Sequence, residues 1–266
     1  METTIESKRP RALYINNALA IYVYVAIISV GYLVLQAAFG FPDILRQPVE
    51  VILQTFQANQ GTIVPAYYAE SLTGILFIIF AVLTHQVFVR RNSSILLLTT
   101  VFGILAGYAQ YTGFIRWVVL KPYLAQVISD PQSSEAALEA VKVVFETSNR
   151  YIGMAVGEHF GFMAQGLWQI GISYVILKEK VFDRRLGWVG LIAGLSILIY
   201  SFEQIGFSSL AFLVVPANAF WACWLLALAT SLLRVDLQTG QAPRVGWIQF
   251  IILIVIFLSF TVPAYL

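Results

Sequence analysis

Charged side chains are scarce in this sequence: Asp, Glu, Lys and Arg make up only 11% of its 266 residues. A soluble domain carries roughly 25%. Hydrophobic residues make up 59%, and the mean hydropathy is +0.79. A water-soluble domain of this length cannot bury so much apolar surface, so the sequence predicts an integral membrane protein. The 16 Lys and Arg are nearly balanced by 14 Asp and Glu, which excludes a nucleic-acid-binding protein.

Residues that build metal and cofactor sites are also few. The single cysteine, Cys223, excludes a disulfide scaffold and a zinc finger. The two histidines, His85 and His159, are predicted on opposite sides of the membrane, so they cannot share a metal ion or a haem. The sequence also lacks a glycine-rich phosphate loop, a G-x-S-x-G motif and an H-E-x-x-H pair. We therefore expect no metal site, and the sequence identifies no cofactor.

Long apolar stretches make up most of the chain, and a helix needs about 20 apolar residues to cross a bilayer. Seven stretches are long enough. They predict an all-α, polytopic seven-helix bundle in a single membrane domain, residues 1–266, with spans at about 15–39, 69–89, 95–120, 151–177, 186–206, 216–234 and 246–265. Because proline favours the first turn of a helix, the sixth span is predicted to start at Pro216, after a short apolar connection at 207–215. A single long kinked helix from residue 208 is the alternative.

Lysine and arginine predict the orientation of the bundle, because they are enriched in cytoplasmic loops. With the N-terminus inside, the inner set is Lys8, Arg9, Arg11, Arg90, Arg91, Lys178, Lys180, Arg184, Arg185, Arg234 and Arg244. The outer set is then only Arg46, Arg116, Lys121, Lys142 and Arg150. We therefore expect a cytoplasmic N-terminus and an external C-terminus. The first span is too long for the h-region of a signal peptide and is interpreted as a membrane anchor.

The two long outer loops each contain an amphipathic pattern. In residues 48–58, apolar side chains recur at helical spacing from Val49 to Phe56, which predicts a helix lying in the membrane interface. In residues 134–148, Ser133 and Ser134 can cap a helix with one apolar and one charged face. The two helices are expected to form either a solvated lip over the membrane surface or a lid over a cavity that opens outward.

Ionisable residues inside the predicted spans are the strongest functional candidates, because each is costly in lipid unless it is paired or hydrated. Five of them are predicted in the outer leaflet: Glu70, Arg116, Glu158, His159 and Glu203. We expect Arg116 within salt-bridge or single-water reach of Glu158, with Glu70 or Glu203 in the same cluster, because a buried guanidinium requires an anion or carbonyl groups. In the alternative, Glu70 and Glu203 reach the headgroups and the Arg116–Glu158 pair only fixes helix packing.

Further polar residues accompany these on the same helices at helical spacing. They are Tyr108, Thr112, Gln165 and Tyr200, with Asn218 near the outer end of the sixth span. Together the stripes predict a polar pocket open to the outside. Its candidate ligand-binding residues are Glu70, Tyr108, Thr112, Arg116, Glu158, His159, Gln165, Tyr200, Glu203 and Asn218.

A short motif in the second half of the chain points to a family. The segment Leu186–Gly194, LGWVGLIAG, follows an Asp-Arg-Arg triplet and precedes a Pro-containing span that ends in Leu-Leu-Arg234. This pattern resembles a bacterial membrane family catalogued only as a domain of unknown function, over most of residues 15–234. The resemblance implies a multi-span protein of the bacterial inner membrane, carries no function over, and makes the span at 246–265 an addition to the family pattern.

Three functions are compatible with these features. The first is the binding or transport of a small amphiphilic ligand, with Glu158 and Arg116 as polar anchors. The second is an intramembrane enzyme that uses Glu70, Glu158 or Glu203 as a general acid or base. The third is a structural or sensory subunit whose charges only pair helices. The expected partners are the lipid bilayer and, in the first case, the ligand; a homo-oligomer is left open.

Overall fold

The computed structural model describes residues 10–88, 94–179, 182–237, 239 and 242–243, and every regular element in these ranges is a helix. The elements are α1 (Arg11–Phe39), η1 (Asp43–Arg46), α2 (Val49–Ala58), α3 (Gln60–Phe88), α4 (Ser94–Val119), α5 (Lys121–Ser129), α6 (Glu135–Ser148), η3 (Asn149–Phe160), α7 (Gly161–Glu179), α8 (Arg184–Tyr200), η4 (Ser201–Ile205), η5 (Ser208–Leu213) and α9 (Val214–Leu233). Six helical stretches in these ranges are long and apolar enough to cross a membrane, which indicates a multi-pass membrane protein. The predicted seventh span, 246–265, lies outside the described residues.

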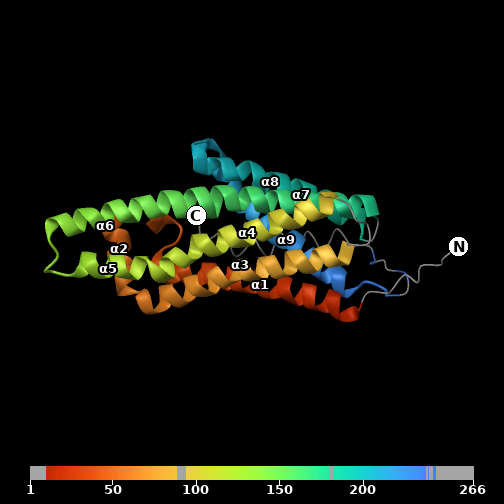
Figure 1. Ribbon diagram of the computed structural model, residues 1–266, viewed down its shortest axis with the longest axis horizontal. Helices are drawn as coiled ribbons and strands as arrows, with labels where there is room; N and C mark the ends of the chain where they lie inside the picture. Colours follow the sequence, from red (N-terminus) through yellow and green to blue (C-terminus); the bar gives the residue numbers. More distant parts are fainter. Residues whose placement is uncertain (1–9, 89–93, 180–181, 238, 240–241, 244–266) are drawn as a thin grey trace.

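The six long helices form a closed ring. Along this ring α1 contacts α3, α3 contacts α4, α4 contacts α7, α7 contacts α8, α8 contacts α9, and α9 returns to α1 (Figure 1). Glycines allow close approaches between neighbours: Gly74 of α3 faces Gly107 of α4, and Gly113 of α4 faces Gly157 of η3. Small residues at such contacts let helix backbones approach each other in lipid.

Two helical stretches are much longer than a bilayer is thick. Residues 94–129 and 135–179 contain 36 and 45 residues, or roughly 54 and 68 Å at about 1.5 Å per residue, against about 30 Å of hydrocarbon. Figure 1 shows α5 and α6 at one end of the molecule, and α2 packs against both. This end, formed by α2, α5 and α6 and called the tip below, therefore extends beyond the hydrocarbon core if the rest of the bundle spans it.

Both amphipathic segments of the predicted loops are helical, as α2 and α6. The Ser134 hydroxyl caps α6 by accepting the Ala137 N–H at 3.2 Å. Lys142 of α6 forms an ion pair with Glu50 of α2, with 2.7 Å between Nζ and the carboxylate. The hydrogen bond that Lys142 donates to Glu50 lowers the pKa of the Glu50 carboxyl below its ordinary value. The ion pair thus adds a polar link to the apolar contact between α2 and the rest of the tip.

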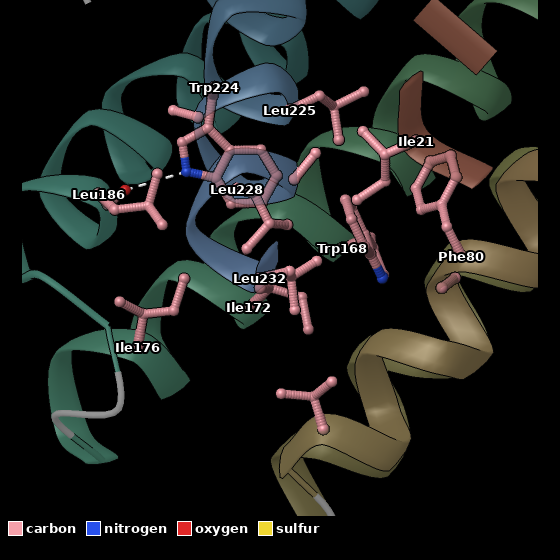
Figure 2. Packing of buried hydrophobic residues seen from close by; sticks show 14 of the residues in the cluster. Ile21, Phe80, Trp168, Ile172, Ile176, Leu186, Trp224, Leu225, Leu228 and Leu232 are labelled. Carbon is pink, nitrogen blue, oxygen red and sulfur yellow. Dashed lines mark hydrogen bonds between the residues drawn. The ribbon is translucent and has the colours of Figure 1, made fainter. Parts of the chain in front are cut away.

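Two separate clusters of buried apolar side chains stabilise the molecule. The bundle cluster lies among the six long helices and is centred on Trp168; Figure 2 shows Trp168, Ile172 and Leu228 packed together, with the Trp224 indole N–H donating to the Leu186 carbonyl at 2.9 Å. The tip cluster joins α2, α5 and α6 to the adjoining turns of α1, α3 and α4. Its large aromatic members are Phe39, Phe56, Tyr67, Trp117 and Phe145.

Three predicted boundaries are corrected by the structure. Helix α3 begins at Gln60, well before the expected 69, because the segment 61–68 also lies in the helix, with Pro65 inside it. The segments 134–148 and 151–177 are not separated by a turn, since Asn149–Phe160 continues the helix in π form. Helical structure resumes at Ser208 as η5 and runs directly into α9, closer to the alternative interpretation than to a non-helical connection.

Candidate functional site

A layer of polar side chains separates the bundle cluster from the tip cluster. On α3 these residues follow Tyr67, the last buried member of the tip cluster, and precede Phe77, the first of the bundle cluster. The layer, called the polar layer below, consists of Glu70, Thr73, Gln110, Arg116 and Glu158. Because it lies inside a helical bundle, each polar group in it needs a partner from the protein or from a bound molecule.

The Glu70 carboxylate is the least compensated group of the polar layer. Its side chain is only 3% exposed. One carboxylate oxygen packs so tightly on Gly31 of α1 that a Cβ at that position would collide with it. Among the described residues no hydrogen-bond donor or cation compensates the burial of this carboxyl. The structure therefore holds a buried acceptor for which the described part of the chain supplies no donor.

Tyr67 lies on the same side of α3, three residues before Glu70. Its ring is 1% exposed and stacks on Trp117, with 4.9 Å between centroids and 8° between planes. Its hydroxyl is buried and has no hydrogen-bond partner in the described ranges. The hydroxyl lies close enough to Glu70, Arg116 and Glu158 to interact with their charges. Tyr67 thus connects the aromatic tip cluster with the polar layer.

The Arg116 guanidinium lies against η3, directly over Gly153, where a Cβ would meet Nη2 at 2.5 Å. Nη1 donates to the Gly113 carbonyl at 2.6 Å, and Nη2 donates to the Asn149 side-chain oxygen at 3.1 Å. Nε is buried without a partner among the residues described. These bonds, rather than a direct ion pair with Glu158, hold the guanidinium, although the charges of Arg116 and Glu158 attract each other.

Glu158 and His159 belong to the π-helix η3, a rare conformation that is frequent at functional sites. The π-helix turns differently from an α-helix, so the α-helical spacing that placed Glu158 and Gln165 on one face does not apply across it. Glu158 is half-buried and is repelled by the carboxylate of Glu203. His159 turns instead to η4, where its Nδ1 lies 2.8 Å from the Ser201 carbonyl oxygen.

A hydrogen-bonded chain joins three helices across the same layer. The Tyr24 hydroxyl of α1 donates to the Gln110 side-chain oxygen at 3.4 Å, and the Gln110 amide donates to the Thr73 hydroxyl at 3.0 Å. The Thr73 hydroxyl donates in turn to the backbone carbonyl of Glu70. The polar groups of Tyr24, Gln110 and Thr73 are thus hydrogen-bonded within the protein. The Glu70 carboxylate lies outside this network.

Lys121, the first residue of α5, is a second buried charge and is 0% exposed. Its Nζ donates to the Ser148 hydroxyl at 3.0 Å and lies 3.6 Å from the centre of the Phe145 ring. The Trp117 ring lies 5.4 Å away. The ammonium is thus held by aromatic faces and a hydroxyl in the tip cluster.

Three of the predicted site residues lie away from the polar layer. Tyr108 is 59% exposed on α4. The Thr112 hydroxyl donates to the Tyr108 carbonyl at 2.9 Å, and the Asn218 amide donates to the Val214 carbonyl of its own helix at 2.7 Å. The hydrogen bonds of Thr112 and Asn218 are thus made within their own helices.

The other predicted residues lie on α7, α8 and η4. Gln165 is buried in α7. Tyr200, also buried, packs on Phe162 with 5.2 Å between ring centroids. The half-buried Glu203 accepts a hydrogen bond from the Gln204 amide and is near enough to Glu158 for their charges to interact. Of the ten candidates, the structure therefore brings Arg116, Glu158 and Glu203 within reach of each other's charges, while Glu70 lies near Tyr67 and against Gly31.

Sequence reasoning missed Tyr67, Gln110, Asn149 and Lys121. Tyr67 lies before the predicted start of its span, although its three-residue spacing from Glu70 places both on one side of a helix. Gln110 lies about 240° around an α-helix from Arg116. It therefore does not belong to the polar face of α4 that the helical spacing predicts. Asn149 and Lys121 fall in segments interpreted as loops, and only the continuous helices bring them to the site.

The chemistry available in the polar layer is recognition through charge and hydrogen bonds. It offers an uncompensated carboxylate, a free tyrosine hydroxyl and one free N–H of a guanidinium. No group of three or more His, Cys, Asp or Glu side chains that could hold a metal ion occurs in the described ranges. The arrangement therefore places unpaired hydrogen-bonding groups inside an otherwise apolar bundle.

Comparison with known proteins identifies a family. The family model described as Domain of unknown function (DUF4386) matches residues 19–233. No curated protein and no solved structure matches the chain. The family match confirms the resemblance inferred from the motif that opens α8 and covers most of the chain, α1 to α9. The chain therefore belongs to the DUF4386 family, a domain family of unknown function.

Proposed function

We propose that this chain is a multi-pass protein of the bacterial inner membrane that binds or transports a small amphiphilic ligand through the polar layer. With the N-terminus inside and the C-terminus outside, the polar layer lies in the outer leaflet and the tip lies on the outer surface. The observation that carries the proposal is the Glu70 carboxylate, which is 3% exposed and has no donor in the described ranges.

A purely structural role does not explain this carboxylate. Helix packing would be served equally well by an apolar side chain, whereas an unpaired carboxylate inside a bundle is strongly unfavourable. Two further groups of the site, the Tyr67 hydroxyl and Arg116 Nε, are also buried without partners in the part of the chain described. Intramembrane ionisable residues of this kind typically mark ligand or ion pathways. A bound polar head group would supply a partner for the Glu70 carboxyl.

The direct test is native mass spectrometry of the protein extracted in a mild neutral detergent. We expect a co-purifying small molecule on the wild-type protein that is depleted in Glu70→Gln. The matched control is Glu135→Gln, the same chemical change at an exposed position on the first turn of α6, which should retain the molecule. The same spectra report the oligomeric state.

Two other outcomes distinguish the alternative functions. A bound molecule that is chemically converted during incubation, and whose conversion stops in Glu70→Gln or Glu158→Gln, would favour an intramembrane enzyme. No bound molecule on either the wild-type protein or the control would contradict ligand binding and favour a structural or sensory subunit.

A further inference from the structure

Each charged side chain around the polar layer has an opposite charge or a hydrogen-bond donor nearby, except Glu70. The positive charge of Arg116 is attracted by Glu158, and that of Lys121 is attracted by Glu146. Glu203 has the Gln204 amide as a donor. For Glu70, in contrast, no cation or donor compensates burial in the described part of the chain. When Glu70 is ionised, the uncompensated charge of the layer is therefore negative.

Arg116 is a poor candidate for the main contact with an anionic ligand. Two of its three nitrogens are bonded to the Gly113 carbonyl and the Asn149 side chain, and its guanidinium is packed over Gly153. An anionic head group at Arg116 would have to displace these contacts. An anion at Glu70 would instead meet a carboxyl, and like charges at close range in a low-dielectric interior repel strongly.

The aromatic residues beside Glu70 are suited to a cation. Tyr67 stacks on Trp117, which packs edge-on against Phe39 at 5.4 Å between centroids. Two positive groups of the protein lie near the Trp117 ring, Arg116 at 5.7 Å and Lys121 at 5.4 Å from its centre, which shows that buried cations are accommodated by this cluster. Cations are attracted to aromatic faces, most strongly when they are removed from water.

We propose that Glu70 binds the positively charged head of a lipophilic cation, of the quaternary ammonium or phosphonium class, between α1 and α3. The proposal rests on the proposed function and names the class of its ligand. Binding exchanges the cation for the proton on the buried Glu70 carboxyl. The resulting carboxylate supplies the opposite charge, and the rings around Tyr67 supply an apolar and cation-attracting wall. A quaternary head has no N–H groups to satisfy, so it needs no further acceptors from the bundle. Because Glu70 packs on Gly31, the cation enters when α1 moves away from α3 at this contact.

The test uses two probes of nearly the same size and shape but opposite charge, tetraphenylphosphonium and tetraphenylborate. Binding to the purified full-length protein in a neutral detergent is measured by titration calorimetry, with empty micelles as the blank. We expect saturable binding of tetraphenylphosphonium to the wild-type protein and to Glu135→Gln. Glu70→Gln should bind it about tenfold more weakly or worse, because the buried counter-charge is removed. Tetraphenylborate should show no saturable binding to any of the three.

A second measurement needs no variant. Dicyclohexylcarbodiimide, an apolar reagent that modifies protonated carboxyl groups in membranes, is applied to the wild-type protein and the labelled peptides are identified by mass spectrometry. Tetraphenylphosphonium should protect Glu70 from labelling, and tetraphenylborate should not. Equal affinity of wild type and Glu70→Gln for the cation, or unchanged labelling of Glu70, would overturn the proposal.

The two probes also distinguish a failure of the cation assignment from a failure of the ligand-binding function. Saturable binding of tetraphenylborate alone, or a neutral lipid as the co-purifying molecule, would overturn the cation assignment while leaving a ligand-binding protein. Absence of any bound molecule in native mass spectra, together with no binding of either probe, would overturn both.

Discussion

Gly74 of α3 and Gly107 of α4 pack with their backbones in contact: a Cβ added at either position would collide with the carbonyl oxygen of the other. Because the colliding atoms belong to the backbone, rotation of a side chain cannot relieve the clash. The contact lies one helical turn from Glu70 and fixes α3 against α4 at the level of the polar layer. The position of the candidate site therefore depends on two residues without side chains.

A methyl group at this contact should destabilise the bundle. We expect Gly74→Ala to lower the free energy of unfolding by about 1–3 kcal/mol, the usual range for overpacking a tight interior. Gly61→Ala is the matched control on the same helix, because nothing lies within 4 Å of a Cβ there. The control should gain up to about 1 kcal/mol, since alanine favours the helix over glycine. Stability is measured by thermal unfolding in detergent. Equal stability of Gly74→Ala and Gly61→Ala would contradict the close contact.

The Lys121 ammonium and the Phe145 ring should be energetically coupled, because Nζ lies 3.6 Å from the ring centre and is fully buried. Phe145→Leu should be more destabilising in the wild-type background than in the Lys121→Met background, by about 1–2 kcal/mol for a desolvated cation–π contact. Ser148 keeps its own bond to the Phe145 carbonyl in both backgrounds. Equal effects of Phe145→Leu in the two backgrounds would show that the ring does not stabilise the charge.

Arg116 and Glu158 should also be coupled, although no direct bond joins them in the described ranges. Removing one charge leaves the other buried without compensation, so each single variant, Arg116→Leu or Glu158→Gln, should be destabilised. The double variant should lose less than the sum of the two, by about 0.5–3 kcal/mol. Arg116→Leu combined with Glu135→Gln is the control and should be additive. A thermal-stability cycle that is additive for both pairs would show that the two charges act independently.

The sequence predicts the membrane class and six of the described spans because apolar run length directly reflects bilayer thickness. It also predicts helices at α2 and α6 from apolar periodicity. It fails where the structure depends on contacts between distant segments. Gln110 of the polar layer lies on a different face from Arg116, and Asn149, which accepts a hydrogen bond from Arg116, lies in a π-helix that no local pattern predicts. Glu70 is found from its type alone, but its lack of a partner is visible only once α1 is packed against it.

The orientation of the bundle and the predicted seventh span can be tested together. Eleven of the sixteen Lys and Arg lie in the predicted inner set, so the positive-inside rule places the N-terminus in the cytoplasm. A reporter fused after Arg234, beyond the sixth span, should then be cytoplasmic, and one fused after Leu266 should be external. Alkaline phosphatase is active only outside the cytoplasm and green fluorescent protein fluoresces only inside it, so the two reporters give opposite signals at each position. A third fusion, after Ser133, reports on which side of the membrane the tip lies. If both C-terminal fusions are cytoplasmic, residues 246–265 do not cross the membrane. If the Ser133 fusion is cytoplasmic, the bundle is inverted, and the polar layer then faces the inside of the cell.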